Sequence, residues 1–145
     1  MLLVLLAVLG TASSAAVGLG AAAARRDAEQ HLLVIGAEFQ QALASHAGRP
    51  RALAELTKDP RAPGIRRHLR RIPIDPLTGR DRWGLVRDAQ GGIVGVHSLA
   101  PGAPLKRTGF DPRWNTFEEA RSYQEWVFGP RTPIMAPLPS PRTSP

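Results

Sequence analysis

The histidines are the side chains of this sequence with the widest chemical repertoire, because imidazole acts both as a general base and as a metal ligand. The four are His31, His46, His68 and His97. No two of them stand three or four residues apart, which is the spacing that places two metal ligands on one helix face. His31 and His46 belong to one predicted long helix, and the others fall in separate elements. We therefore expect four separate histidines at the surface or at an interface, and no metal site.

The other groups that could carry out catalysis are also scattered. Ser98 lacks the context of a nucleophile elbow, and Gly91-Gly92 is followed by no Lys-Ser or Lys-Thr pair that would complete a phosphate-binding loop. The absence of cysteine excludes a disulfide framework, a thiolate metal site and a cysteine nucleophile. Aspartate in turns usually accepts hydrogen bonds from the backbone. Four aspartates stand in turn-rich segments: Asp75, Asp81, Asp88 and Asp111. The sequence therefore predicts a protein that is not an enzyme and requires no cofactor.

A dense positive patch is the strongest sign of a binding partner. The net charge is +7, and four arginines lie close together around His68, namely Arg66, Arg67, Arg70 and Arg71. We expect a helical turn here, with Ile65 and Leu69 inward and the arginines outward. Such a patch is a solvated face, a contact for an acidic protein or a lipid headgroup, or a phosphate site. No aromatic or glycine-rich motif accompanies it, so a nucleic-acid partner is not expected.

The elements that would position these groups begin with an uncharged N-terminal segment. No charged residue occurs from Met1 through Ala24, and a helix of that length spans roughly 36 Å, enough for the hydrocarbon core of a bilayer. Small residues at four-residue spacing would allow close approach of a neighbouring helix. The predicted residues of this membrane and assembly helix are Leu2, Leu3, Leu5, Leu6, Leu9, Gly10, Ser14 and Gly18.

The same helix is predicted to continue to about Ser45. Leu32, Ile35, Phe39 and Leu43 recur at three- and four-residue steps, which indicates an apolar stripe that lies on a sheet. Charged and amide side chains lie mostly off this stripe, among them Arg25, Asp27, Glu29, Gln40 and Gln41. Gly36 weakens the helix slightly. Gly48 suits the end of the helix, and Pro50 cannot continue it.

The rest of the chain predicts a small antiparallel sheet with short helices. A short helix is expected over 51–58, a rigid connector over 72–79, and two strands over 83–87 and 93–99 joined by the turn 88–92. Gly95 is expected at a bulge. An irregular loop over 101–110 then leads to a helix that starts at Asp111-Pro112, with Thr116 and Glu119 as a capping box.

The end of the chain predicts a closing strand over 126–128 and a proline-rich tail without a packed core over 129–145. Aromatic residues are 6% of the chain, so the specific packing is expected in the C-terminal half, where most of them stand. The predicted organisation is thus an assembly helix over 1–24, an α+β head over 25–128, and the tail over 129–145.

The order of these features resembles a known family. Pro50-Arg-Ala-Leu53 follows the long helix, and a Pro-x-Asp-Pro stretch leads toward Trp83-Gly84 and a strand that ends at His97-Ser98-Leu99. The residues of this turn and strand start are Pro73, Asp75, Pro76, Gly79, Trp83 and Gly84. The layout is similar to the pilin-like and pseudopilin subunits of type II secretion and type IV pilus machines, particularly subunits of the major-pseudopilin type.

This resemblance implies a pilin-like fold and a structural role. The chain would be a subunit of a secretion pseudopilus or pilus-like filament, anchored by a single pass in the inner membrane before assembly, with its head in the periplasm. Its partners would be other pilin-like subunits and inner-membrane components of the machine. Some relatives bind calcium in a C-terminal loop, but the loop over 101–110 contains no acid, so no metal is expected.

Two departures from the family concern the N-terminus. The family's basic leader, which ends in Gly before a Phe-Thr-Leu-x-Glu start, does not stand before Leu2-Leu3-Val4. Arg25 and Arg26 directly follow the uncharged segment, and the positive-inside rule alone would place the head in the cytoplasm. We expect the true start to lie upstream of Met1, because a basic leader there would remove both departures.

A second reading from a different class is a soluble periplasmic binding module. Ala22 and Ala24 supply the Ala-x-Ala pattern of a signal-peptide cleavage site. Cleavage there would release a domain whose patch at Arg66–Arg71 captures an acidic partner. A nucleic-acid-binding protein is a third and weaker reading, which would require steeply salt-dependent binding.

Overall fold

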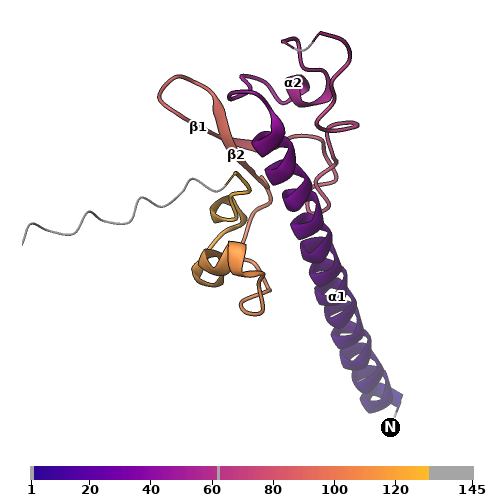
Figure 1. Ribbon diagram of the computed structural model, residues 1–145. Coiled ribbons are helices and arrows are strands. Elements are labelled where there is room, and N and C mark those ends of the chain that lie inside the picture. Colours follow the sequence, from indigo (N-terminus) through magenta and orange to yellow (C-terminus); the bar gives the residue numbers. More distant parts are fainter. Residues whose placement is uncertain (1, 62, 131–145) are drawn as a thin grey trace, which may run out of the picture.

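The computed structural model describes the backbone of residues 2–61 and 63–130, with side chains from residue 17 onward. Two α-helices, α1 (Leu2–Ser45) and α2 (Ala54–Thr57), precede two strands, β1 (Gly84–Arg87) and β2 (Ile93–His97), and two 3-10 helices, η1 (Pro112–Glu119) and η2 (Tyr123–Glu125). Helix α1 is a long rod, and the described chain after it, up to residue 130, folds against its C-terminal half (Figure 1). The predicted α+β arrangement of a long helix on a small antiparallel sheet is therefore confirmed.

The buried face of α1 follows the spacing that the sequence predicts. Leu32, Phe39, Ala42 and Leu43 are buried in the core, and Ile35 is partly buried beside them. The helix ends at Ser45, and Gly48 takes the positive φ (+91°) that glycine adopts without strain. Within the described residues, no helix combines the length and the apolar character that a membrane crossing requires.

The sheet is a hairpin in which β1 and β2 pair antiparallel. Gly84 lies opposite His97, and the register shifts near the turn because Val86 faces Gly95 whereas Arg87 faces Ile93. Val94 is thus the extra residue of a bulge beside the predicted Gly95. The turn is held by the Asp88 carboxylate, which accepts hydrogen bonds from two backbone N–H groups within 88–92.

The predicted closing strand over 126–128 is wrong in extent. A single antiparallel bridge joins Phe128 to Val96, with N–O distances of 2.8 and 2.9 Å. Phe128 is fully buried and lies against Gly36 of α1, where a Cβ atom would overlap its ring. Gly36, which the sequence identifies as a weak position in the helix, is therefore the place where the Phe128 ring approaches the helix backbone.

Two further local predictions are also wrong. Residues 65–71 form no helical turn, and Ile65 is 72% exposed, although Leu69 is buried as predicted. The N–H groups of His68 and Leu69 both donate to the carbonyl of Leu56 at 2.8 Å, and this pairing ties the irregular segment to α2. The tertiary contact with α2 therefore replaces the local helix.

The segment after Asp111 is a 3-10 helix with non-helical angles at Trp114. Asp111 caps it as predicted, because its carboxylate accepts the N–H of Arg113 at 3.0 Å. The expected capping box is not formed, because Thr116 and Glu119 stand at the middle and the end of η1. Aromatic rings from this segment and the chain after it form one connected cluster, as the composition predicts: Phe110, Trp114, Phe117, Tyr123, Trp126 and Phe128.

Several predictions fall outside the described residues. The predicted tail lies there from residue 131 onward. The side chains of seven predicted assembly residues also lie there: Leu2, Leu3, Leu5, Leu6, Leu9, Gly10 and Ser14. Gly18 is the predicted assembly residue that the structure describes in full.

We predict that Gly36→Ala destabilises the head. Alanine favours the helix by about 1 kcal/mol, but overpacking against the Phe128 ring costs about 1 to 3 kcal/mol. Thermal unfolding of the full chain in detergent should therefore show a lower Tm. Gly20→Ala is the matched control, because nothing lies within 4 Å of that position. A Gly36→Ala chain that is as stable as the Gly20→Ala chain would show that the ring does not need this glycine.

Candidate functional site

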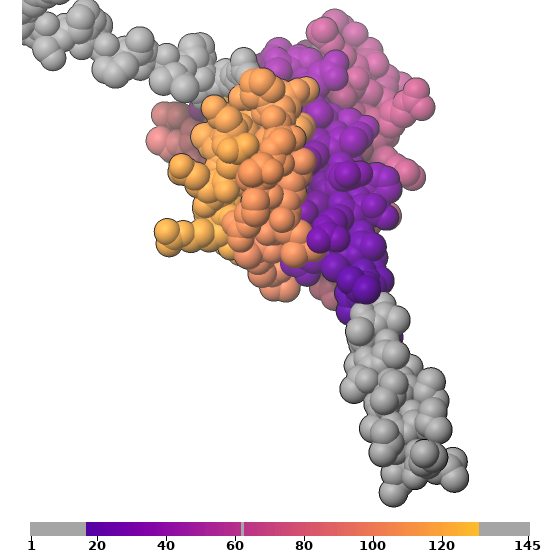
Figure 2. Space-filling model, turned by 90° about the horizontal axis from the view of Figure 1, so that it is seen from below, coloured from indigo at the N-terminus to yellow at the C-terminus, as the bar shows by residue number. Residues whose placement is uncertain are grey.

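The N-terminal part of α1 extends beyond the head. Val17 and Leu19 are 73% and 75% exposed, and no atom lies within 4 Å of a Cβ built at Gly18 or Gly20. The head packs along the described part of α1 (Figure 2), and Ala21, Ala22 and Ala24 line a hollow with Pro76, Leu77 and Leu105. The described residues before Ala21 therefore have apolar side chains without an intramolecular partner.

A buried carboxylate ties the head to α1 near this exit point. Glu29, which the sequence places off the apolar stripe, is 1% exposed. Its oxygens accept the backbone N–H groups of Leu105 and Lys106, at 2.6 and 2.9 Å, and the hydroxyl of Tyr123 at 2.6 Å. The acid that the 101–110 loop lacks thus comes from the helix, and it binds the loop's backbone.

Arg25 completes this connection one turn earlier on the helix. Its guanidinium donates to the Tyr123 hydroxyl at 2.9 Å and to the carbonyl of Pro101 at 3.0 Å, and it lies over the Tyr123 ring. Burial and the hydrogen bond to Glu29 raise the pKa of Tyr123 to about 12, although the hydrogen bond from Arg25 lowers it. The neutral phenol is therefore the form that the folded chain favours.

The Pro-x-Asp-Pro stretch forms the turn that the sequence predicts. Asp75 is fully buried, and its carboxylate accepts the N–H of Leu77 at 2.9 Å and the hydroxyl of Ser98 at 2.6 Å. Gly79 takes a positive φ (+68°), and its N–H donates to the Asp75 carbonyl. Pro76 stands inside this turn. The Asp75 side chain thus fastens the connector to the end of β2.

The remaining residues of this motif pack the connector against α1. The indole N–H of Trp83 donates to the carbonyl of Pro73 at 2.9 Å, and its ring meets Phe39 edge-on at 4.9 Å between centroids. Gly84 leaves room for the ring of His97 across the strand pair. All six motif residues therefore serve one structural unit.

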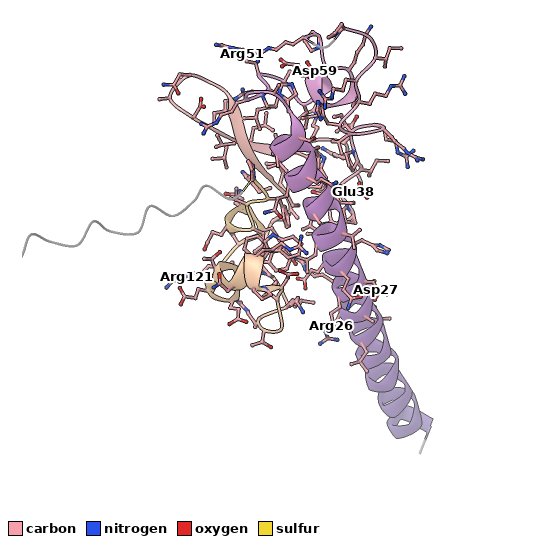
Figure 3. The ribbon with its side chains drawn as sticks, in the orientation of Figure 1. Arg26, Asp27, Glu38, Arg51, Asp59 and Arg121 are labelled. Atoms are coloured by element: carbon pink, nitrogen blue, oxygen red, sulfur yellow. The ribbon has the colours of Figure 1, made fainter. Side chains whose placement is uncertain are left out.

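Two of the four histidines come together, which corrects the prediction that all four stand apart. His46 and His68 lie 5.3 Å apart between ring centroids, and both Nε2 atoms face the buried carboxylate of Asp59, at 3.9 and 3.4 Å. Their Nδ1 atoms face the Gly48 carbonyl at 3.2 Å and the Ser45 hydroxyl at 2.6 Å. This cluster joins the end of α1 to the segment after α2, at the opposite end of the head from Arg26 (Figure 3).

The order Ser45, His68, Asp59 is that of the groups in many nucleophilic sites, but the proton positions differ. The Ser45 hydroxyl donates its single proton to the carbonyl of Ala42 at 3.1 Å, so its oxygen accepts from His68. A general base must instead accept the proton of the nucleophile. Ser45 also ends α1, where the partial negative charge of the helix disfavours an oxyanion. The contacts of this cluster are those of a structural link.

The electrostatics of the cluster agree with this link. The N–H of Arg61 donates to the Asp59 carboxylate at 2.9 Å and is the main cause that lowers its pKa, with His68 contributing. In the described ranges 17–61 and 63–130, no group of three or more His, Asp or Glu side chains is arranged to hold a metal ion.

The predicted basic patch is exposed but not helical. The side chains of Arg66, Arg67, Arg70 and Arg71 all face solvent. Among the described residues, no ion pair or hydrogen bond engages any of their guanidinium groups. The Asp75 turn brings two further exposed arginines to the same connector, since Arg71, Arg80 and Arg82 line one shallow hollow. This larger surface is not apparent from the spacing of the sequence.

We predict that the stability of the chain depends on Tyr123 in alkaline solution. Because the folded state raises the pKa of Tyr123 from 10.0 to about 12, its contribution is complete below pH 10 and is lost as the pH rises through 12. This tyrosine is the chain's single one, so the tyrosinate absorbance of the folded protein reports it directly. Tyr123→Phe should cost about 1 to 3 kcal/mol at neutral pH. The stability difference from the wild type should shrink above pH 10, and a constant difference would contradict the raised pKa.

Comparison with known protein families, with curated proteins and with solved structures finds no match.

Proposed function

We propose that this chain is a non-enzymatic structural subunit of a type II secretion pseudopilus or a type IV pilus-like filament. Before assembly, its N-terminal helix anchors it by a single pass in the inner membrane, and its pilin-like head stands in the periplasm. Its partners are other pilin-like subunits and inner-membrane components of the secretion machine.

The observation that carries this proposal is the division of α1 into two parts. From Glu29 to Leu43 one face of the helix is covered by the head. Before Ala21 the described side chains are bare, although Val17 and Leu19 are large and apolar. Exposed apolar surface costs about 25 cal/mol per Å² in water. A long apolar segment that continues a structured helix therefore calls for another apolar environment, either lipid or the helices of neighbouring subunits.

The residue types in this segment favour neighbouring helices as the final environment. Gly18 and Gly20, with the alanines of 21–24, leave the helix backbone accessible. Small residues permit close contact between helices, where dispersion and weak backbone contacts stabilise association. Copies that repeat one heterologous contact form an open helical array, which is a filament.

A soluble periplasmic module remains the second candidate, and the unpaired arginines favour it. Arg66, Arg67, Arg70 and Arg71 are exposed cations without a partner among the described residues, as expected of a surface for an acidic protein. Sequencing the N-terminus of the mature protein separates the two candidates. A start near Arg25 supports the soluble module, and retention of Leu2 to Ala24 supports the filament subunit.

We predict that Gly18→Glu abolishes incorporation into filaments without unfolding the head. Among the described residues, no atom outside the neighbouring helix backbone lies within 4 Å of a Cβ built at Gly18, so its replacement leaves the head's contacts intact. A carboxylate buried between apolar helices costs several kcal/mol, which corresponds to a loss of incorporation of roughly 100-fold or more. The measurement compares the sheared filament fraction with the membrane fraction in the producing cells.

Gln30→Glu is the matched control, because Gln30 is exposed on the same helix beside the head. This variant should assemble like the wild type. Normal assembly of the Gly18→Glu chain would refute the proposed role of the free helix.

A further inference from the structure

The end of the head where α1 leaves it carries two adjoining hollows. One is formed between residues 21–28 of α1 and the side chains of Pro76, Leu77 and Leu105. The other is lined by Leu77, Arg80, Arg82 and Leu99, with Thr78 and Pro101. Leu77 lines both, so the hollows form one continuous surface, which we call the collar and define by Leu77, Leu99, Leu105, Arg80 and Arg82.

The collar lies at a defined level along α1. Its inner wall is Ala21, Ala22 and Ala24, the last residues of the uncharged segment, followed directly by Arg25. With a rise of 1.5 Å per residue, Ala21 and Arg25 are about 6 Å apart along the axis. In a subunit anchored by that segment, this short interval coincides with the boundary between lipid and water.

The composition of the collar fits that boundary. Leu99 and Leu105 are large apolar side chains that remain 47% and 42% exposed. Arg80 and Arg82 are exposed beside Leu99, and no acidic side chain lines either hollow. Asp81 stands between the two arginines in the sequence and lines a further hollow together with Arg71, Arg80 and Arg82. Apolar tips among cations are the pattern of proteins that lie on anionic membrane surfaces.

The two arginines are also free to bind. Within the described residues, no hydrogen bond or ion pair engages the side chain of Arg80 or Arg82. Arg25, by contrast, is occupied by Tyr123 and Pro101, so it positions the loop that carries Leu99 and Leu105. Guanidinium groups bind phosphate oxygens in a bidentate manner.

We propose that the collar docks on the anionic lipid surface around the exit of α1 before the subunit enters a filament. Leu77, Leu99 and Leu105 enter the boundary between headgroups and acyl chains, and Arg80 and Arg82 bind lipid phosphates. This inference rests on the proposed function, because it requires the uncharged segment to remain in the bilayer. Docking holds the head at a fixed orientation to the membrane and covers the collar until assembly.

The test uses the full chain, which has no native cysteine and accepts a single label. Leu99→Cys carries an environment-sensitive dye, and the protein is reconstituted into vesicles of phosphatidylcholine with or without phosphatidylglycerol. Emission should shift to the blue on the anionic vesicles and return toward the solution value at high salt, because salt screens the arginine contacts. The matched label is Gln90→Cys at the tip of the β1–β2 hairpin, at the other end of the head (Figure 1), and its emission should not change.

A pair of double variants separates the collar from the overall charge. Arg80→Gln with Arg82→Gln should shift the ratio of docked to undocked heads toward the undocked state, by about fivefold for each charge removed. Arg66→Gln with Arg67→Gln removes the same charge from a patch outside the collar and should leave the ratio unchanged. All four arginines are exposed, so both variants retain the contacts of the head.

The outcomes distinguish the two proposals. Flotation of the vesicles in a density gradient reports whether the chain is anchored. If the chain floats with neither kind of vesicle, the membrane anchor fails, and the docking proposal fails with it. If the chain floats with both but the Leu99 label reports the same environment on each, the anchor stands and the docking proposal is overturned. Equal effects of the two double variants would also overturn it, in favour of an effect of the overall charge. A response of the label that depends on the protein density in the vesicle and not on lipid charge would overturn it in favour of a contact with a second copy.

Discussion

One apolar face of α1 supports the entire head. A two-stranded hairpin is marginally stable by itself in water, and among residues 2–61 and 63–130 β1 and β2 gain only the single bridge at Phe128. Their inward side chains, including Ile93 and Val96, join one cluster with Leu32 and Phe39 of the helix. Because the helix supplies the other wall of the core, the head and the C-terminal half of α1 form one folding unit.

The small amount of regular structure imposes a second requirement. Most of the described chain between residues 46 and 130 is irregular, and its buried backbone groups need hydrogen-bond partners outside helices and strands. Buried or partly buried carboxylates provide them. Glu29 binds the 105–106 backbone, Asp59 binds the N–H of Arg61, and Asp75 binds that of Leu77. These acids therefore position loops by binding their backbone N–H groups.

The position along α1 at which the head stops links the fold to the proposed function. The hydrogen bonds that tie the head to α1 at this end come from Arg25 and Glu29, and the described side chains Val17 and Leu19 before them stay exposed to other molecules. If the head covered more of α1, it would compete with neighbouring helices or with lipid for the same surface. The same position places the exposed leucines and arginines of the collar beside the point where the helix leaves the head.

The sequence by itself determined the features that depend on neighbouring residues. These are the long helix and its end at Gly48 and Pro50, the hairpin with its turn, and the Asp75 turn, because local periodicity and turn chemistry act over a few residues. Only the tertiary structure decided which distant residues meet. His46 reaches His68 and Asp59, Glu29 is buried by a loop some 75 residues later, and Phe128 lies on Gly36. The segment 65–71 stays non-helical for the same reason, since its hydrogen-bond partner is Leu56. Such pairings are set by how the chain closes on α1, and no local pattern in the sequence records them.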